Sequence, residues 1–176
     1  MSWIDTYTGQ RFTYFSEDTD SIVIEDIAHG LANICRFTGQ CRYFYSVAQH
    51  CVMATHLVPA NLKLQAILHD SAETYISDLP RPLKQLFPEI KALEKNILKR
   101  IFIKFNVPFP EDPLVKIADE QLLFAEAEKL FTKGTSEWEC NIKHKLKSNP
   151  FEFVGFWEPK LAEMRFLETF YHLYKG

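Results

Sequence analysis

At 176 residues the chain is long enough to bury the core of one domain, and its 47% hydrophobic share is ordinary for a globular protein. The formal net charge of −3 argues against a general grip on nucleic-acid backbones, which needs a basic surface. Because no apolar run approaches the roughly 20 residues of a membrane span and no signal peptide is recognisable, we expect a cytoplasmic protein that binds neither membranes nor polymeric nucleic acid. The four cysteines show no Cys-x-x-Cys spacing, and we interpret them as free thiols.

The N-terminal part predicts an arm, a helix and a loop suited to a charged aromatic ligand. Residues 1–23 are rich in aromatic side chains without a sustained period, so we expect an N-terminal arm that packs on the body. Apolar residues at helical spacing predict the first helix over residues 25–34. The loop over residues 36–45 combines two arginines with four aromatic side chains. Guanidinium groups suit phosphate or carboxylate, and flat rings suit a nucleobase.

A helix start signal precedes the first candidate metal ligand. Ser46 and Gln49 have the Ser-x-x-Gln spacing of a capping box, which predicts a helix from there to about Val58. His50 lies on the less polar side of this helix. Taken alone, His50 is more often a hydrogen-bonded core histidine than a ligand.

An adjacent His69-Asp70 pair follows an apolar helical run. Burying both side chains is costly unless something binds them, and a metal ion is the usual partner. If residues 62–75 form one helix, Glu73 lies at i+4 from His69 and at i+3 from Asp70, so all three face one cavity. This stretch therefore predicts two metal ligands and one acid/base group.

The chain then breaks and resumes as helices. Asp78 and two prolines end the predicted helix, and Lys84 follows just beyond, which predicts a cation near the metal. Residues 88–106 predict a long amphipathic helix whose basic outer face is most simply solvated. Residues 107–113, with three prolines, predict a rigid connector.

The next predicted helix, residues 114–131, carries Asp119 beside apolar neighbours, with Lys116 one turn earlier on the same side. A buried carboxylate usually has a partner, although Asp119 alone would be interpreted as a surface residue. Residues 135–157 form an irregular aromatic-rich segment that either covers the site or makes a subunit contact. A last helix over residues 158–174 has an apolar stripe that fits core or an oligomer interface.

The chain shows no convincing strand and no internal repeat, so we predict a single all-α domain over residues 1–176. Three of its predicted helices supply four candidate metal ligands, namely His50, His69, Asp70 and Asp119. Two imidazoles with two carboxylates suit zinc, manganese, iron or cobalt and leave coordination positions open. An open site of this kind polarises a phosphoryl oxygen and lowers the pKa of bound water.

Other polar residues would complete such a phosphate chemistry. Glu73 would position the water or move a proton. The phosphate oxygens would be neutralised by three cations, Lys84, Lys116 and Arg36.

The four ligands, in this order, resemble the H…HD…D signature of the HD-domain metal-dependent phosphohydrolases, whose all-α fold holds the metal between its central helices. Three longer motifs are similar to those of small bacterial 5′-deoxynucleotidases, namely His69-Asp70-x-x-Glu73, Asp78-Leu79-Pro80-x-Pro82-x-Lys84 and Lys116-x-Ala118-Asp119. In that subgroup an Arg-Trp pair grips phosphate and stacks on the nucleotide, and its matching positions here are Arg36 and Phe37. The resemblance also implies that Glu73 and Asp78 serve catalysis and water orientation.

Three N-terminal motifs, namely Tyr7-Thr8-Gly9, residues 24–29 and residues 45–50, look more like a phage branch of this family that includes dATP triphosphohydrolases. Those enzymes release deoxyadenosine and triphosphate and bind extra divalent ions along the phosphates. The resemblance thus implies an oligomeric enzyme of the cytoplasm, or phage-encoded and active in the host cytoplasm, that hydrolyses small deoxynucleotides. A 5′-deoxynucleotidase acting on monophosphates and a non-catalytic module that binds nucleotide or metal are the alternatives. Phe37 replaces the family's Trp and Gln40 replaces a His common in the phage branch, so the base preference stays open.

Overall fold

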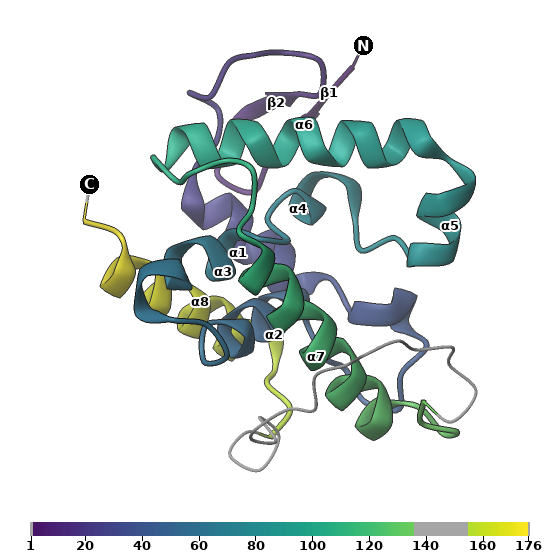
Figure 1. The fold of residues 1–176 in the computed structure, drawn as a ribbon. Helices are drawn as coiled ribbons and strands as arrows, with labels where there is room; N and C mark the ends of the chain where they lie inside the picture. The colour runs from purple at the N-terminus through teal and green to yellow at the C-terminus, as the bar shows by residue number, and fades with distance from the viewer. Residues whose placement is uncertain (1, 136–154, 176) are drawn as a thin grey trace.

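Helices make up most of the residues that the computed structural model describes, which are residues 2–135 and 155–175 (Figure 1). The α-helices are α1 (Ile24–Asn33), α2 (Val47–Ala54), α3 (Lys63–Leu68), α4 (Glu73–Ile76), α5 (Arg81–Leu86), α6 (Pro88–Lys104), α7 (Pro113–Leu130) and α8 (Pro159–Leu173). Short 3-10 helices span Arg36–Gly39 and Ala60–Leu62. Most of the predicted irregular segment, residues 136–154, lies outside the described residues.

The prediction of an all-α chain needs one correction, because the N-terminal arm contains a β-hairpin. Strand β1 (Trp3–Asp5) pairs antiparallel with β2 (Arg11–Thr13). Three residues per strand are too few for a period of two to stand out in the sequence. The turn is fixed to α1, since the Asp26 carboxylate accepts hydrogen bonds from the backbone N–H (2.7 Å) and hydroxyl (2.9 Å) of Thr8. The arm therefore packs on the body, as predicted.

Arg100 on α6 anchors the second half of the arm. Its side chain is buried, and its guanidinium donates to the carbonyls of Thr13 (3.0 Å) and Asp18 (2.7 and 3.2 Å). The same guanidinium lies 4.6 Å from the centre of the buried Phe12 ring. This one side chain therefore ties the end of β2 and the segment that follows it to α6. Figure 1 shows the hairpin lying beside α6.

Helix α2 lies at the centre of the described helices. It packs against α1, α3, α7 and α8, and every one of its residues is buried. Its predicted start is confirmed, because the Ser46 hydroxyl accepts a hydrogen bond from the Gln49 backbone N–H (3.1 Å). It ends at Ala54, four residues before the predicted end. Burial on all sides means that a polar side chain on α2 must find its partner inside the protein.

The predicted continuous helix over residues 62–75 is wrong. Helix α3 ends at Leu68, residues 69–72 form tight turns, and α4 begins at Glu73. The break has a local cause, since the His69 ring donates from Nδ1 to the Ala66 carbonyl (2.7 Å). In a continuing α-helix that carbonyl would accept from the N–H of Asp70. The His69-Asp70 pair therefore lies on a turn and not within a helix.

The later predicted helices agree with α6, α7 and α8 within two residues at each end. Each begins with proline at its first position, where the missing N–H costs nothing. The apolar stripe of α8 is partly core, with Ala162, Phe166 and Phe170 buried, while Leu161 and Met164 remain exposed. Across the described residues, no helix combines the length and apolar character needed to cross a bilayer.

We expect Arg100→Lys to lower the free energy of unfolding by about 2 kcal/mol, because one ammonium cannot replace a buried fork that donates to carbonyls at two points of the arm. Urea titration followed by circular dichroism measures the change. The control is Lys99→Arg, a basic exchange at the exposed neighbouring position, which should leave the midpoint unchanged. Equal stability of Arg100→Lys and wild type would show that the arm is not anchored by this side chain.

Candidate metal centre

The four predicted ligands come together at one point. His50 comes from α2, Asp119 from α7, and His69 and Asp70 from the turn after α3. Their ligand atoms all lie within 4.8 Å of one another. His50 Nε2 is 3.2 Å from both His69 Nε2 and Asp119 Oδ1, and His69 Nε2 is 3.2 Å from Asp70 Oδ2. Ligand atoms that share one ion at about 2.1 Å lie roughly 3.0 to 3.4 Å apart, so this spacing fits a single first-row metal ion.

The hydrogen bonds of the two histidine rings fix which nitrogen faces the cluster. His50 Nδ1 is 2.7 Å from a Glu126 carboxylate oxygen, and His69 Nδ1 is 2.7 Å from the Ala66 carbonyl. Both partners can only accept, so each Nδ1 carries a proton, and in the neutral ring each Nε2 presents a lone pair to the cluster. Two neutral rings would face each other with lone pairs, which repel unless a metal ion or a proton lies between them. The donor set therefore fits a divalent metal ion.

The charges of the cluster are also those of a cation site. Burial alone would lower the pKa of His69, but the Asp70 carboxylate raises it well above its usual range. Burial would likewise raise the pKa of Asp119, yet hydrogen bonds with His50 and His69 hold it well below its usual range. Despite burial, the pKa of Asp70 is lowered to about 2, mainly by His69. The two carboxylates thus stay ionised and attract positive charge.

Glu126 belongs to the centre although it was not among the predicted site residues. It is fully buried on α7, two helical turns after Asp119, with one oxygen on His50 Nδ1 and the other 2.9 Å from Arg36 Nε. The same carboxylate also acts on the buried Tyr45, whose pKa burial and Glu126 raise. The signal in the sequence was the i+7 spacing from Asp119, which places both acids on one face of a helix.

Arg36 and Phe37 lie beside the centre. The buried Arg36 guanidinium contacts Glu126 and also places one terminal nitrogen 3.5 Å from Asp70 Oδ2. Phe37 has a left-handed backbone conformation (φ 57°), and its N–H donates to Asp78 Oδ2 (3.0 Å). Asp78, a predicted catalytic residue, therefore holds the loop that carries Phe37.

Glu73 and Lys84 form a pair next to the ligands. Glu73 is buried, and one of its oxygens lies 3.2 Å from Lys84 Nζ, which also contacts Glu94 at 2.5 Å. Its other oxygen, Oε2, is buried without a hydrogen-bond partner among the described residues. Burial, followed by the charges of Asp70 and Asp78, raises the pKa of Glu73 well above its usual range.

Lys116 is the one predicted site residue that the structure leaves apart from the cluster. It lies exposed on α7, and its charge acts on Glu111 in the connector before that helix. No contact within the described part of the chain joins Lys116 to the four ligands. Its predicted contact with phosphate stays a prediction.

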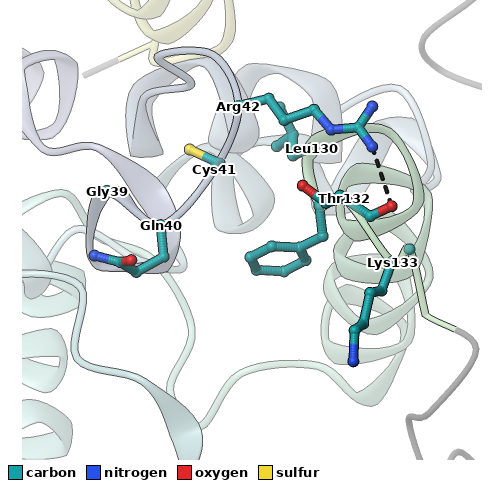
Figure 2. A pocket seen from close by; sticks show the side chains of 9 residues that line it. Gly39, Gln40, Cys41, Arg42, Leu130, Thr132 and Lys133 are labelled. Atoms are coloured by element: carbon teal, nitrogen blue, oxygen red, sulfur yellow. Dashed lines mark hydrogen bonds between the residues drawn. The ribbon is translucent and has the colours of Figure 1, made fainter.

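A cavity of about 690 Å³ opens between the loop after Phe37 and the end of α7 (Figure 2). Residues 39–42 and 130–134 line it. The Phe131 ring at its wall contacts the Phe37 ring edge to face, with centres 4.9 Å apart. Figure 2 shows Arg42 bound to the Thr132 carbonyl, at 3.1 Å, across this end of α7. A volume of this size accommodates a nucleotide, and the Phe37–Phe131 pair links it to the metal centre.

Two relatives resemble this chain over most of its length. The uncharacterized protein YfdR of Escherichia coli K12 is 43% identical over 138 residues, which are 78% of this chain and 78% of YfdR. The uncharacterized protein RCAP_rcc00048 of Rhodobacter capsulatus is 30% identical over 154 residues, 80% of this chain and 78% of the relative. No model of a known protein family matches the sequence.

We expect the wild-type protein to bind Co²⁺ or Zn²⁺ and to be stabilised by about 2.7 kcal/mol when the ion is present at 100 times its dissociation constant. Asp70→Ala should remove this stabilisation while far-UV circular dichroism stays helical, because Asp70 lies on a turn and not in a helix. Thermal unfolding with and without the ion measures both. Asp20→Ala, at an exposed position, is the control and should respond like wild type. An equal thermal shift in Asp70→Ala would exclude Asp70 as a ligand.

Proposed function

Because the chain belongs to the same family as YfdR, a protein described as uncharacterized, we propose its function from its own site: it is a metal-dependent phosphohydrolase of the HD-domain type that acts on deoxynucleotides. The observation that carries this proposal is the convergence of the H…HD…D residues. His50, the His69-Asp70 pair and Asp119 are far apart in the sequence, yet their ligand atoms lie within 4.8 Å of one another. Two of the longer motifs that resemble the 5′-deoxynucleotidases include His69, Asp70 and Asp119.

The ligand set suits zinc, cobalt or manganese and leaves coordination positions open. A bound ion of this kind supplies Lewis-acid chemistry, since it polarises a phosphoryl oxygen and makes water more acidic. The protein contributes the orientation of its ligands through Glu126 and the Ala66 carbonyl.

Glu73 is the residue that we assign to proton movement. Lys84 holds its Oε1, so the unpaired Oε2 is the atom free to accept a proton from water or to return one. The raised pKa of Glu73 favours its holding and releasing a proton in this way. Lys84 therefore acts through Glu73, and the ammonium stabilises the carboxylate once the proton has left.

Arg36 and Phe37 provide the substrate contacts of this proposal. The Arg36 guanidinium lies next to Asp70, where its terminal nitrogens can meet a phosphate oxygen beside the ion. Phe37 follows directly, and its ring stands between Arg36 and the cavity wall formed by Phe131. A phosphate at Arg36 thus directs the nucleoside toward the Phe37–Phe131 pair and the cavity.

The substrate that we favour is dATP, hydrolysed to deoxyadenosine and triphosphate with extra divalent ions on the phosphates. The phage-like motifs of the N-terminal half support this choice. The second candidate is a 5′-deoxynucleotidase, which the motif from Asp78 to Lys84 supports. A non-catalytic regulatory module would not need Glu73, and Glu73 is present and buried beside the ligands.

Product analysis separates these candidates. Purified protein with Co²⁺, Mn²⁺ or Zn²⁺ is incubated with deoxynucleoside mono-, di- and triphosphates, and the products are resolved by chromatography. Deoxyadenosine with intact triphosphate from dATP is the expected result. Orthophosphate from monophosphates alone would instead show a 5′-deoxynucleotidase, and no turnover of any nucleotide would contradict the proposed function.

We expect Glu73→Gln to keep metal affinity but to lose turnover by about 10²- to 10⁴-fold, because the amide cannot accept the proton. Steady-state kinetics beside a metal-binding titration measures the two effects. Glu94→Gln is the matched control, since Glu94 contacts the same Lys84, and we expect its turnover to stay within about threefold of wild type. Wild-type turnover in Glu73→Gln would show that Glu73 does not transfer the proton.

Phe37→Ala should raise KM for the nucleotide by about tenfold, the lower end of what base–aromatic stacking contributes, with little change in kcat. Phe37→Trp should leave KM at the wild-type value or lower it, because the larger ring keeps the stacking face. Phe15→Ala, at a ring that is 81% exposed, serves as the control. An unchanged KM in Phe37→Ala would show that the nucleobase does not stack on this ring.

A further inference from the structure

Glu126 is an acidic residue that is fully buried, and burying a carboxylate costs free energy of desolvation. Its carboxylate has no exposed surface, and Leu122, Ala127 and Leu130 of the same helix are buried too. A charge in such a place persists only where partners repay its desolvation. Its closest polar partners are two residues of the candidate site, His50 and Arg36.

The two carboxylate oxygens divide these partners between them. Oε1 lies 2.7 Å from His50 Nδ1, and Oε2 lies 2.9 Å from Arg36 Nε. The first contact forces the proton onto Nδ1 and leaves the Nε2 lone pair for an ion. The second contact holds the guanidinium so that another of its nitrogens reaches Asp70. One side chain therefore fixes a metal ligand and a substrate-binding cation at the same time.

The two histidine rings are oriented by different kinds of hydrogen-bond partner. The Nδ1 of His69 donates to a neutral backbone carbonyl of its own turn, so its orientation is local. His50 is oriented by a charged group from another helix, α7, which also carries Asp119. The orientation of His50 thus depends on a residue that simultaneously holds the Arg36–Phe37 loop.

We propose that Glu126 is a positioning residue that couples the metal centre to the Arg36–Phe37 loop: it orients His50 for metal binding and, through Arg36, holds the loop that binds substrate. The metal half of this proposal stands on the geometry alone. The substrate half rests on the proposed function.

Glu126→Gln tests the coupling with almost no change in shape. An amide has one accepting oxygen and a donating nitrogen, whereas His50 and Arg36 both present donors to this position. We expect the affinity for Co²⁺, measured by competition with a chelator, to fall by about 10- to 100-fold. Glu128→Gln, at an exposed glutamate on the same helix, is the matched control and should bind Co²⁺ like wild type. Unchanged affinity in Glu126→Gln would overturn the proposal.

A double mutant separates positioning from general support of the fold. If Glu126 acts through His50, Glu126→Gln should cost less than about threefold in Co²⁺ affinity once His50→Ala is already present. An equal cost in both backgrounds would mean that Glu126 supports the fold and does not orient the ligand. If Glu126→Gln does not fold, Glu126→Asp keeps the buried charge but cannot span both partners, and the same loss of about 10- to 100-fold is expected of it.

The substrate half has its own readout. At saturating Co²⁺, Glu126→Gln should raise KM for the nucleotide by about tenfold while kcat changes less than about threefold, because Arg36 is released but the ion is restored. A wild-type KM would overturn this half. If the wild-type protein hydrolyses no nucleotide, the proposed function fails, whereas the affinities for Co²⁺ still decide the metal half.

Discussion

Two imidazole nitrogens that face each other 3.2 Å apart set the constraint on which the centre of this protein depends. Such an arrangement is stable only with positive charge between the rings. Asp70 and Asp119 supply the opposing negative charge, and the pKa of both is held low. A cation at this point explains why a histidine on α2 is buried on every side and why carboxylates surround it.

The surrounding fold serves to keep these groups in place. Helix α2 is enclosed by four other helices, so His50 has no alternative partner in water. The His69 ring ends α3 by taking a helix carbonyl, and this break puts the HD pair on a turn. Glu126 then ties α7 to both His50 and Arg36. Positions fixed by burial and hydrogen bonds are what a metal site needs, because ligands that are held in advance cost less to order.

The sequence was sufficient for the features that have a local signal. Spacing and chemistry predicted His50, the HD pair and Asp119, and proline or serine marked the starts of α2, α6, α7 and α8. Features that depend on tertiary contacts were not predictable in this way. The hairpin strands are too short to show a period, the break at His69 arises from a side-chain bond, and Lys84 pairs with two glutamates. Glu126 is one of several glutamates on α7, and only its burial, which depends on the surrounding helices, distinguishes it from the others.

The most direct test of a metal centre is anomalous diffraction from crystals of the protein soaked in Co²⁺, recorded at the cobalt edge. The account predicts one strong peak among His50 Nε2, His69 Nε2, Asp70 and Asp119, at about 2.0 to 2.2 Å from the ligand atoms. A peak only at other residues, or no peak with the four side chains in place, would contradict the central claim that these residues form a metal site.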